Sequence, residues 1–155
     1  MTTPAPSYTI EFWEDDRGHK PVLDWIKNDL TPTQRRALGT AMLGILQRLG
    51  PDVCDSKWGK WVATGVAEFR LRMTGEQVVN AGWATGEEID TSETVLLRVF
   101  FHVHGEKIVM LLEGYDKGAS PSKKIQQAKI QSAEKRLKQW KARQAIDSKP
   151  KRRKS

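Results

Sequence analysis

Three arginines in two short segments carry the clearest chemical signal in the chain. Arg70 and Arg72 alternate with apolar residues in segment 67–73, and Arg98 lies in a second alternating segment, 95–104. A period of two is typical of a β-strand, so we expect these arginines on one face of a sheet. Because a planar guanidinium group binds phosphate with two hydrogen bonds at once, such a cluster would bind an anion.

A purely structural interpretation fits the same spacing. Glu68 and Glu113 could pair across strands with Arg70 and Arg98 to form a ladder of opposite charges. The two interpretations are compatible, because one ion pair can hold an arginine ready for a phosphate.

An aromatic residue and several lysines follow the last predicted strand. Tyr115 and Lys117 end that strand, and Lys123 and Lys124 come just after Ser120-Pro121, which is predicted to begin the final helix. Phosphates suit a strand end beside a helix N-terminus, where backbone N–H groups add to the side-chain charge. Tyr115 could stack on an unpaired RNA base; alternatively it is a sheet-edge aromatic and the lysines are solvated.

Histidine adds one candidate, and no metal pattern is evident. His102 is expected on the same face as Arg98 and Tyr115, which makes it a candidate RNA-binding residue, although a histidine without chemistry is the commoner case. His102 and His104 are two apart on a strand and His19 is remote, so we expect neither a metal nor another cofactor. RNA cleavage without metal would need a base, an acid and cations around the phosphorus.

Charge is unevenly distributed along the chain. Residues 117–155 hold 14 Lys/Arg against 2 Asp/Glu, a net +12, whereas residues 1–116 hold 12 against 17, a net −5. This asymmetry indicates a region that faces a polyanion, most simply RNA, attached to a mildly acidic body. The alternative is a solvated basic helix with a solubilising tail.

The compartment is inferred from cysteine and hydropathy. One cysteine, Cys54, cannot form an internal disulfide, so a reducing compartment is expected. The first residues do not resemble a signal peptide, and the longest apolar run, 108–112, is too short to span a membrane. We therefore expect a cytoplasmic protein with no membrane partner.

The predicted elements run strand, two helices, three strands and a long helix. Thr31, Pro32 and Gln34 form a capping-box pattern that begins the second helix, which Gly50 and Pro51 end. This order predicts an α+β fold with an antiparallel sheet, helices packed on one face, and the other face partly open. The expected ranges are strands 8–12, 67–73, 95–104 and 107–115, helices 21–29, 32–49 and 121–145, a turn-rich connection 52–65 and an exposed loop 74–93.

The domain boundaries follow from these elements. We expect a flexible N-terminus at 1–7, one folded domain at 8–145 and a disordered basic tail at 146–155.

The last two strands are predicted to form a hairpin around a two-residue turn at Gly105-Glu106. In that register Val103 would face Ile108, Phe101 would face Met110 and Val99 would face Leu112. The opposite layer would then carry Arg98, Phe100, His102 and His104 beside Val109, Leu111, Glu113 and Tyr115. A slip of one residue would invert this assignment.

Several motifs, taken in order, resemble the RelE/HigB superfamily of toxins, and more closely its phage-derived HigB-like branch. They cover about residues 8–143. The motifs are Pro21-Val22-Leu23-Asp24-Trp25, Leu49-Gly50, Glu68-Phe69-Arg70, Leu97-Arg98-Val99-Phe100-Phe101, Ile108-Val109-Met110-Leu111-Leu112-Glu113-Gly114-Tyr115-Asp116-Lys117, and Pro121 with a Lys-rich helix.

The resemblance implies a compact RelE-like domain that acts as the toxin of a type II toxin–antitoxin system. It implies metal-independent endoribonuclease cleavage of mRNA on the ribosome, and neutralisation by an antitoxin, expected to carry a helix-turn-helix domain. Carried over by position, Arg70, Arg98, Tyr115 and Lys117 would be catalytic, with no residue assigned as acid or base. Asp116-Lys117-Gly118 departs from the family's paired lysines, and this leaves a second hypothesis open: a noncatalytic RNA- or ribosome-binding protein on the same fold.

Overall fold

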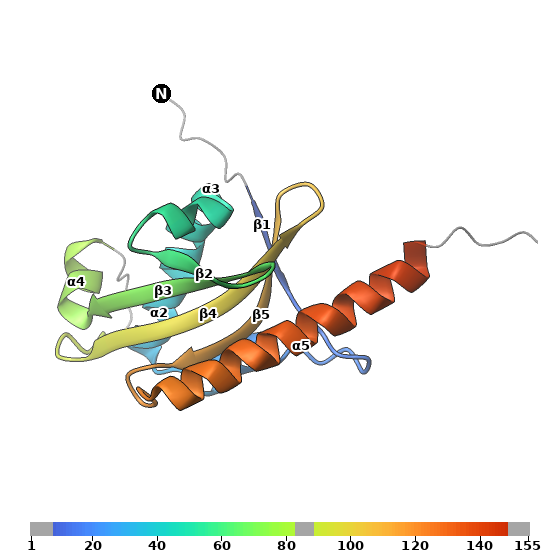
Figure 1. The fold of residues 1–155 in the computed structure, drawn as a ribbon. Helices are drawn as coiled ribbons and strands as arrows, with labels where there is room; N and C mark the ends of the chain where they lie inside the picture. The colour runs from blue at the N-terminus through green and yellow to red at the C-terminus, as the bar shows by residue number, and fades with distance from the viewer. Residues whose placement is uncertain (1–7, 83–88, 149–155) are drawn as a thin grey trace, which may run out of the picture.

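A five-stranded mixed sheet lies between two helical layers in the computed structural model, which describes residues 8–82 and 89–148 (Figure 1). The strands are β1 (Thr9–Phe12), β2 (Gly59–Ala63), β3 (Val66–Thr74), β4 (Thr94–His104) and β5 (Ile108–Asp116). The helical segments are α1 (Pro21–Asn28), α2 (Pro32–Ala41), η1 (Met42–Leu46), α3 (Gln47–Leu49), η2 (Gly50–Asp55), α4 (Gly75–Asn80) and α5 (Lys123–Ser148). The α+β class is therefore confirmed.

The strand order is β1-β5-β4-β3-β2, and the sheet is not wholly antiparallel as predicted. β1 pairs with β5 in parallel, with Thr9 opposite Ile108, while the other neighbouring strands are antiparallel. The alternation of side chains in 8–12 shows that this segment is a strand. It contains nothing that sets the direction of the partner.

Local signals placed the early helices correctly. The Thr31 hydroxyl accepts from the Gln34 backbone N–H, and the Gln34 side chain accepts from the Thr31 N–H, so the predicted capping box is present. The helical run from α2 through the π-helical turn η1 ends at Leu49, and Gly50 follows with a positive φ. Besides the short 3-10 helix η2, the segments predicted as a connection and a loop contain β2 and the short helix α4.

The hairpin of β4 and β5 has a three-residue loop, so the predicted register is wrong by one position. His104 lies opposite Ile108 and Val103 opposite Val109. Gly105 and Lys107 both adopt a positive φ, which allows the longer loop.

This register changes which residues share a face. Met110 and Leu112 lie beside Phe100 in one apolar cluster, whereas Val109 and Leu111 belong to the other. A bulge near Leu112 then shifts the pairing, so that Phe100 lies opposite Glu113. The bulge returns the end of β5 to the predicted face.

Both faces of the sheet are therefore covered, which corrects the prediction that helices pack on one face only. The helices before β2 cover one face, and α5 packs obliquely on the other, chiefly against β5 (Figure 1). Helical spacing in the sequence puts Ile130, Ala133, Leu137 and Trp140 on one side of this helix, and the first three are buried there, with 7%, 0% and 4% of their surface exposed. The reason is the slipped register, because it turns Met110 and Leu112 toward α5 and gives the stripe an apolar surface to cover.

The helix α5 continues through Ser148, past the predicted end at 145. The predicted flexible N-terminus 1–7 and the last residues of the predicted tail, 149–155, lie outside the described residues. In the part of the chain that the structure describes, no helix is both long and apolar enough to cross a membrane.

Candidate nucleic-acid interface

Strand pairing places three of the predicted site residues side by side. Arg70 of β3 lies opposite Arg98 of β4, and Arg98 lies opposite Tyr115 of β5. Directly opposed residues of an antiparallel pair project from the same face, so these side chains form one row across three strands. This is the face that α5 crosses, because Tyr115 belongs to the apolar cluster beneath that helix.

A buried carboxylate links this row. Glu68 is 0% exposed, and its Oε1 accepts a 2.7 Å hydrogen bond from Nε of Arg70 and lies 3.9 Å from Nε of Arg98. Its other oxygen accepts from Nε2 of Gln126 at 2.9 Å. Glu68 pairs with Arg70, but both lie on β3, so this pair does not cross strands as predicted; across strands Glu68 reaches Arg98, and it also reaches α5. Two like charges opposite each other would destabilise the sheet, and Glu68 offsets that repulsion.

The second expected pair is absent. Glu113 lies with Ser132 and Arg136 of α5, at 2.7 Å and 3.3 Å, instead of pairing with Arg98. The bulge near Leu112 moves Glu113 opposite Phe100, one row away from the arginine.

Arg98 is the more enclosed of the two central arginines. Its side chain is 12% exposed, against 33% for Arg70. Burial lowers the pKa of the Arg98 guanidinium from its usual range, and the neighbouring Glu68 opposes that shift. Nη1 of Arg98 donates to the Leu97 carbonyl at 3.3 Å, while its buried Nε has no hydrogen-bond partner. Arg98 therefore offers a desolvated cation with a donor to spare.

Tyr115 lies in the row but cannot stack on a base as predicted. It is 4% exposed, and its ring stacks on Phe100 with centroids 6.2 Å apart and planes 4° from parallel. Its hydroxyl is buried without a hydrogen-bond partner, and burial and the Glu68 charge raise the Tyr115 pKa. The prediction failed because sequence gave no sign that α5 would cover this part of the sheet.

Beside the row lies a surface depression of about 290 Å³, lined by Lys57, Trp58, Arg70, Arg72 and Arg98. The depression lies where β2 begins. Among the described residues, the part of β3 beyond that point has no strand paired with it on this side, so it is an edge of the sheet. The Arg70 N–H donates to the Trp58 carbonyl at 2.7 Å, which anchors Trp58 beside the arginines. Arg72 joins the cluster as predicted.

Two of the lining residues, Lys57 and Trp58, were missed as site residues by sequence reasoning. They belong to the segment predicted as a turn-rich connection, which kept them off the sheet. A Thr64-Gly65 turn between apolar segments was the signal for the hairpin of β2 and β3, which brings them there.

The predicted lysines lie near the row. The Lys117 backbone N–H donates to the Leu96 carbonyl at 2.9 Å, so this residue is tied to β4 directly after the last strand. Lys123 and Lys124 are exposed on the first turn of α5, where the Ser122 hydroxyl accepts from the Ile125 N–H in the capping position. That turn is close to the arginines, because Gln126 on the next turn reaches Glu68.

Asp116, which stands where the RelE/HigB motifs have a lysine, has a structural role. Its carboxylate accepts from Nε2 of the buried Gln34 at 2.7 Å and from the Ala119 N–H at 3.1 Å. Asp116 therefore ties the loop after β5 to α2, and holds Lys117 in place from the opposite side of the sheet.

His102 does not join the cluster. It shares the face of Arg98 but lies four residues farther along β4, about 13 Å away at the usual rise per residue. Its Nδ1 lies 2.7 Å from the Gly65 carbonyl, and its ring packs against Trp140 of α5, with centroids 5.8 Å apart. Burial lowers the pKa of His102. These contacts make it a packing residue beneath the second half of α5.

No group of three His, Cys, Asp or Glu side chains that could hold a metal occurs within residues 8–82 and 89–148. Comparisons with protein-family models, curated proteins and solved structures found no match to the chain. Membership of the RelE/HigB superfamily therefore stays a prediction from the motifs.

Proposed function

We propose that this chain is a RelE/HigB-like toxin that cleaves mRNA on the ribosome without a metal. The observation that carries the proposal is the row of Arg70, Arg98 and Tyr115 around buried Glu68, whose two arginines line the depression beside it. An α+β domain that ends in a long basic helix also supports the proposal.

The proposed reaction needs charge stabilisation above all. The 2′-oxygen of RNA attacks the adjacent phosphorus, its proton passes to a base, and the bond to the 5′-oxygen breaks as that oxygen gains a proton. Arg70, Arg98 and Lys117 stabilise the negative charge that grows on the phosphate oxygens. Burial raises the pKa of Tyr115, so its hydroxyl stays protonated beside Arg98.

Glu68 serves this site as a positioning residue. Both of its oxygens already accept hydrogen bonds, and the carboxylate is fully enclosed. It sets the distance between the two guanidinium groups and so prepares them for a phosphate.

The exposed lysines suit the proposed partners. Lys123 and Lys124, on the first turn of α5, would contact the RNA backbone in the cytoplasm. Lys135 and Lys138 are also exposed on this helix and would meet an acidic segment of a helix-turn-helix antitoxin.

A second candidate function is RNA or ribosome binding without cleavage. Among the described residues that line the depression, none is a carboxylate or an imidazole, so no acid or base is in evidence at its surface. This alternative predicts salt-sensitive RNA binding and no cleaved product.

Expression in cells that lack an antitoxin tests the proposal. We expect growth and translation to stop, primer extension to show discrete cleavage sites in mRNA, and Arg98→Ala to relieve all three effects. Arg48→Ala, at an exposed arginine of α3, is the matched control and should stay toxic. A folded, fully toxic Arg98→Ala protein would rule out this site, and growth arrest without cleaved mRNA would favour the noncatalytic alternative.

A further inference from the structure

Trp58 lines the depression, and its ring is held in place by its neighbours. Its ring stacks on the buried Phe69 with centroids 6.4 Å apart and planes 21° from parallel. Nζ of Lys57 lies 5.1 Å from the ring centroid, and the Trp58 carbonyl accepts from the Arg70 N–H. Because the ring is already held in place, it loses little conformational entropy when a base takes the place of the exposed Lys57 side chain beside it.

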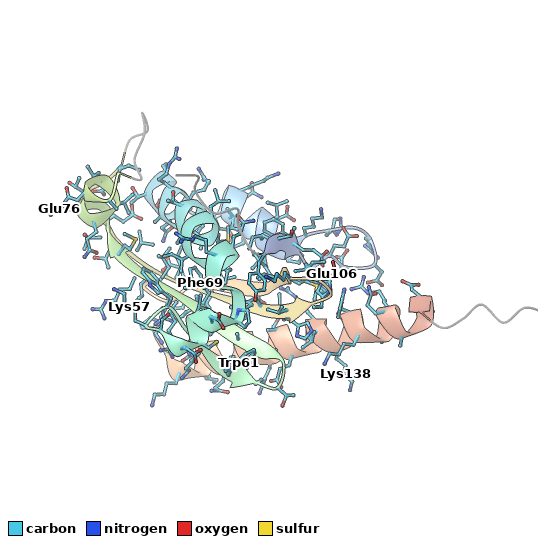
Figure 2. All side chains as sticks on the ribbon, turned by 90° about the horizontal axis from the view of Figure 1, so that it is seen from above. Lys57, Trp61, Phe69, Glu76, Glu106 and Lys138 are labelled. Atoms are coloured by element: carbon cyan, nitrogen blue, oxygen red, sulfur yellow. The ribbon has the colours of Figure 1, made fainter. Side chains whose placement is uncertain are left out.

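The rest of the depression is cationic. Arg70, Arg72 and Arg98 share it with Trp58, and Lys57 stands at its rim, projecting from this edge of the sheet in Figure 2. Guanidinium groups bind phosphate and aromatic rings bind the flat face of a base, so this lining matches the two halves of a nucleotide. A volume of about 290 Å³ is at the small end for ligand sites, which suits one nucleotide.

Two hydrogen-bond donors in the row have no partner among the described residues. Nε of Arg98 and the hydroxyl of Tyr115 are buried and make no hydrogen bond. Of these two residues only Arg98 lines the depression, so only its guanidinium group can meet an anion bound there. Tyr115 is enclosed, however, so the aromatic surface for a base must come from another residue.

We propose that this depression is a nucleotide subsite for single-stranded RNA, in which Trp58 stacks one base while Arg70 and Arg98 hold the neighbouring phosphate. This inference rests on the proposed function and deepens it by naming the residue that contacts a base. A base inside a duplex has no free face, so the subsite selects unpaired RNA.

The test compares substitutions at Trp58 with one at Trp61. Trp58→Met keeps an apolar side chain against Phe69 but removes the aromatic face, and Trp58→Phe keeps a smaller one. Trp61→Met is the control, because Trp61 is 55% exposed on β2, does not line the depression, and lies apart from Lys57 in Figure 2. Thermal melting of each variant first establishes that it is folded.

The probe is a short single-stranded RNA that carries 2-aminopurine, whose fluorescence falls when the base stacks. We expect quenching with the wild type, Trp58→Phe and Trp61→Met, and loss of quenching with Trp58→Met, together with about tenfold weaker binding. Undiminished quenching and affinity in a folded Trp58→Met protein would overturn the subsite, as would equal quenching of the same RNA in a duplex.

These outcomes are separable from the fate of the toxin proposal. If the chain binds RNA without cleaving it, the Trp58-dependent quenching remains while cells that express it show no cleaved mRNA. If it is a toxin without this subsite, Arg98→Ala abolishes toxicity while Trp58→Met leaves both toxicity and quenching unchanged.

Discussion

Glu68→Gln removes the negative charge between Arg70 and Arg98 while preserving the shape of the side chain. Oε1 of Glu68 lies 2.7 Å from Nε of Arg70 and 3.9 Å from Nε of Arg98, and the carboxylate is 0% exposed. The substitution therefore leaves two opposed arginines with no carboxylate between them. It tests whether Glu68 holds a cationic pair in readiness for an anion.

The expected cost follows from these distances. Two unit charges about 4 Å apart interact by about 4 kcal/mol at an effective dielectric constant of about 20. Removing one partner of a buried ion pair costs about 3–5 kcal/mol in unfolding free energy. Arg70 is one-third exposed and stays partly hydrated. We therefore expect the low end, about 3 kcal/mol, or about 6–12 °C in melting temperature.

The assay is thermal and urea unfolding with and without sulfate. A sulfate ion can replace the lost charge between the guanidinium groups, so we expect sulfate to stabilise Glu68→Gln more than the wild type.

Glu113→Gln is the matched control for this assay. Nη1 of Arg136, the partner of Glu113, still donates to the Leu112 carbonyl at 2.7 Å. The Arg136 guanidinium also keeps its contact with the Trp13 ring. Because Arg136 retains these partners, this change should cost only about 1 kcal/mol, and it should add no sulfate response.

Two results would refute this reasoning. One is a Glu68→Gln protein whose unfolding free energy lies within about 1 kcal/mol of the wild-type value, because the carboxylate would then contribute little to holding the arginines. The other is an equal gain from sulfate in Glu68→Gln and Glu113→Gln, because sulfate would then act on the whole surface and not between the two guanidinium groups.

Two further predictions concern stability. A Cβ at Gly114 would lie 2.6 Å from Cζ3 of Trp25, whereas Gly39 has open space at its Cβ. Gly114→Ala should therefore lower the unfolding free energy by about 1–3 kcal/mol in urea, and Gly39→Ala should raise it by up to about 1 kcal/mol; equal effects would contradict this. Burial lowers the pKa of His102, so its contribution to stability is present above the usual histidine pKa and is lost as pH falls through that value. His102→Gln keeps a side-chain donor for the Gly65 carbonyl. It should therefore lose less unfolding free energy than the wild type between about pH 7 and about pH 5, and parallel pH profiles would refute the assignment.

Local signals in the sequence predicted most elements, and the two misses had readable signals as well. Thr74 and Gln77 form a second capping box, which begins α4 in the segment predicted as a loop. The glycines and acids around Thr74 favour an exposed loop, so they obscure this helix start in the sequence. The candidate site was predicted in part: Arg70, Arg72 and Arg98 came together, while Trp58 was missed and His102 lies elsewhere.

Side-chain alternation by itself determined that Arg70, Arg72 and Glu68 share a face of one strand, because residues two apart in a strand always project to the same side. The spacing of apolar residues every three to four positions likewise determined the apolar stripe of the final helix.

Only the tertiary structure decided which surfaces meet. The one-residue shift in register at Gly105 and the bulge near Leu112 depend on how β5 packs. Together they determine which residues of the sheet α5 packs against, and they bury Tyr115. The parallel pairing of β1 and the contact from Gln126 to Glu68 join residues far apart in the chain. Short-range patterns carry no information about such contacts, because their free energy arises only when distant segments pack together.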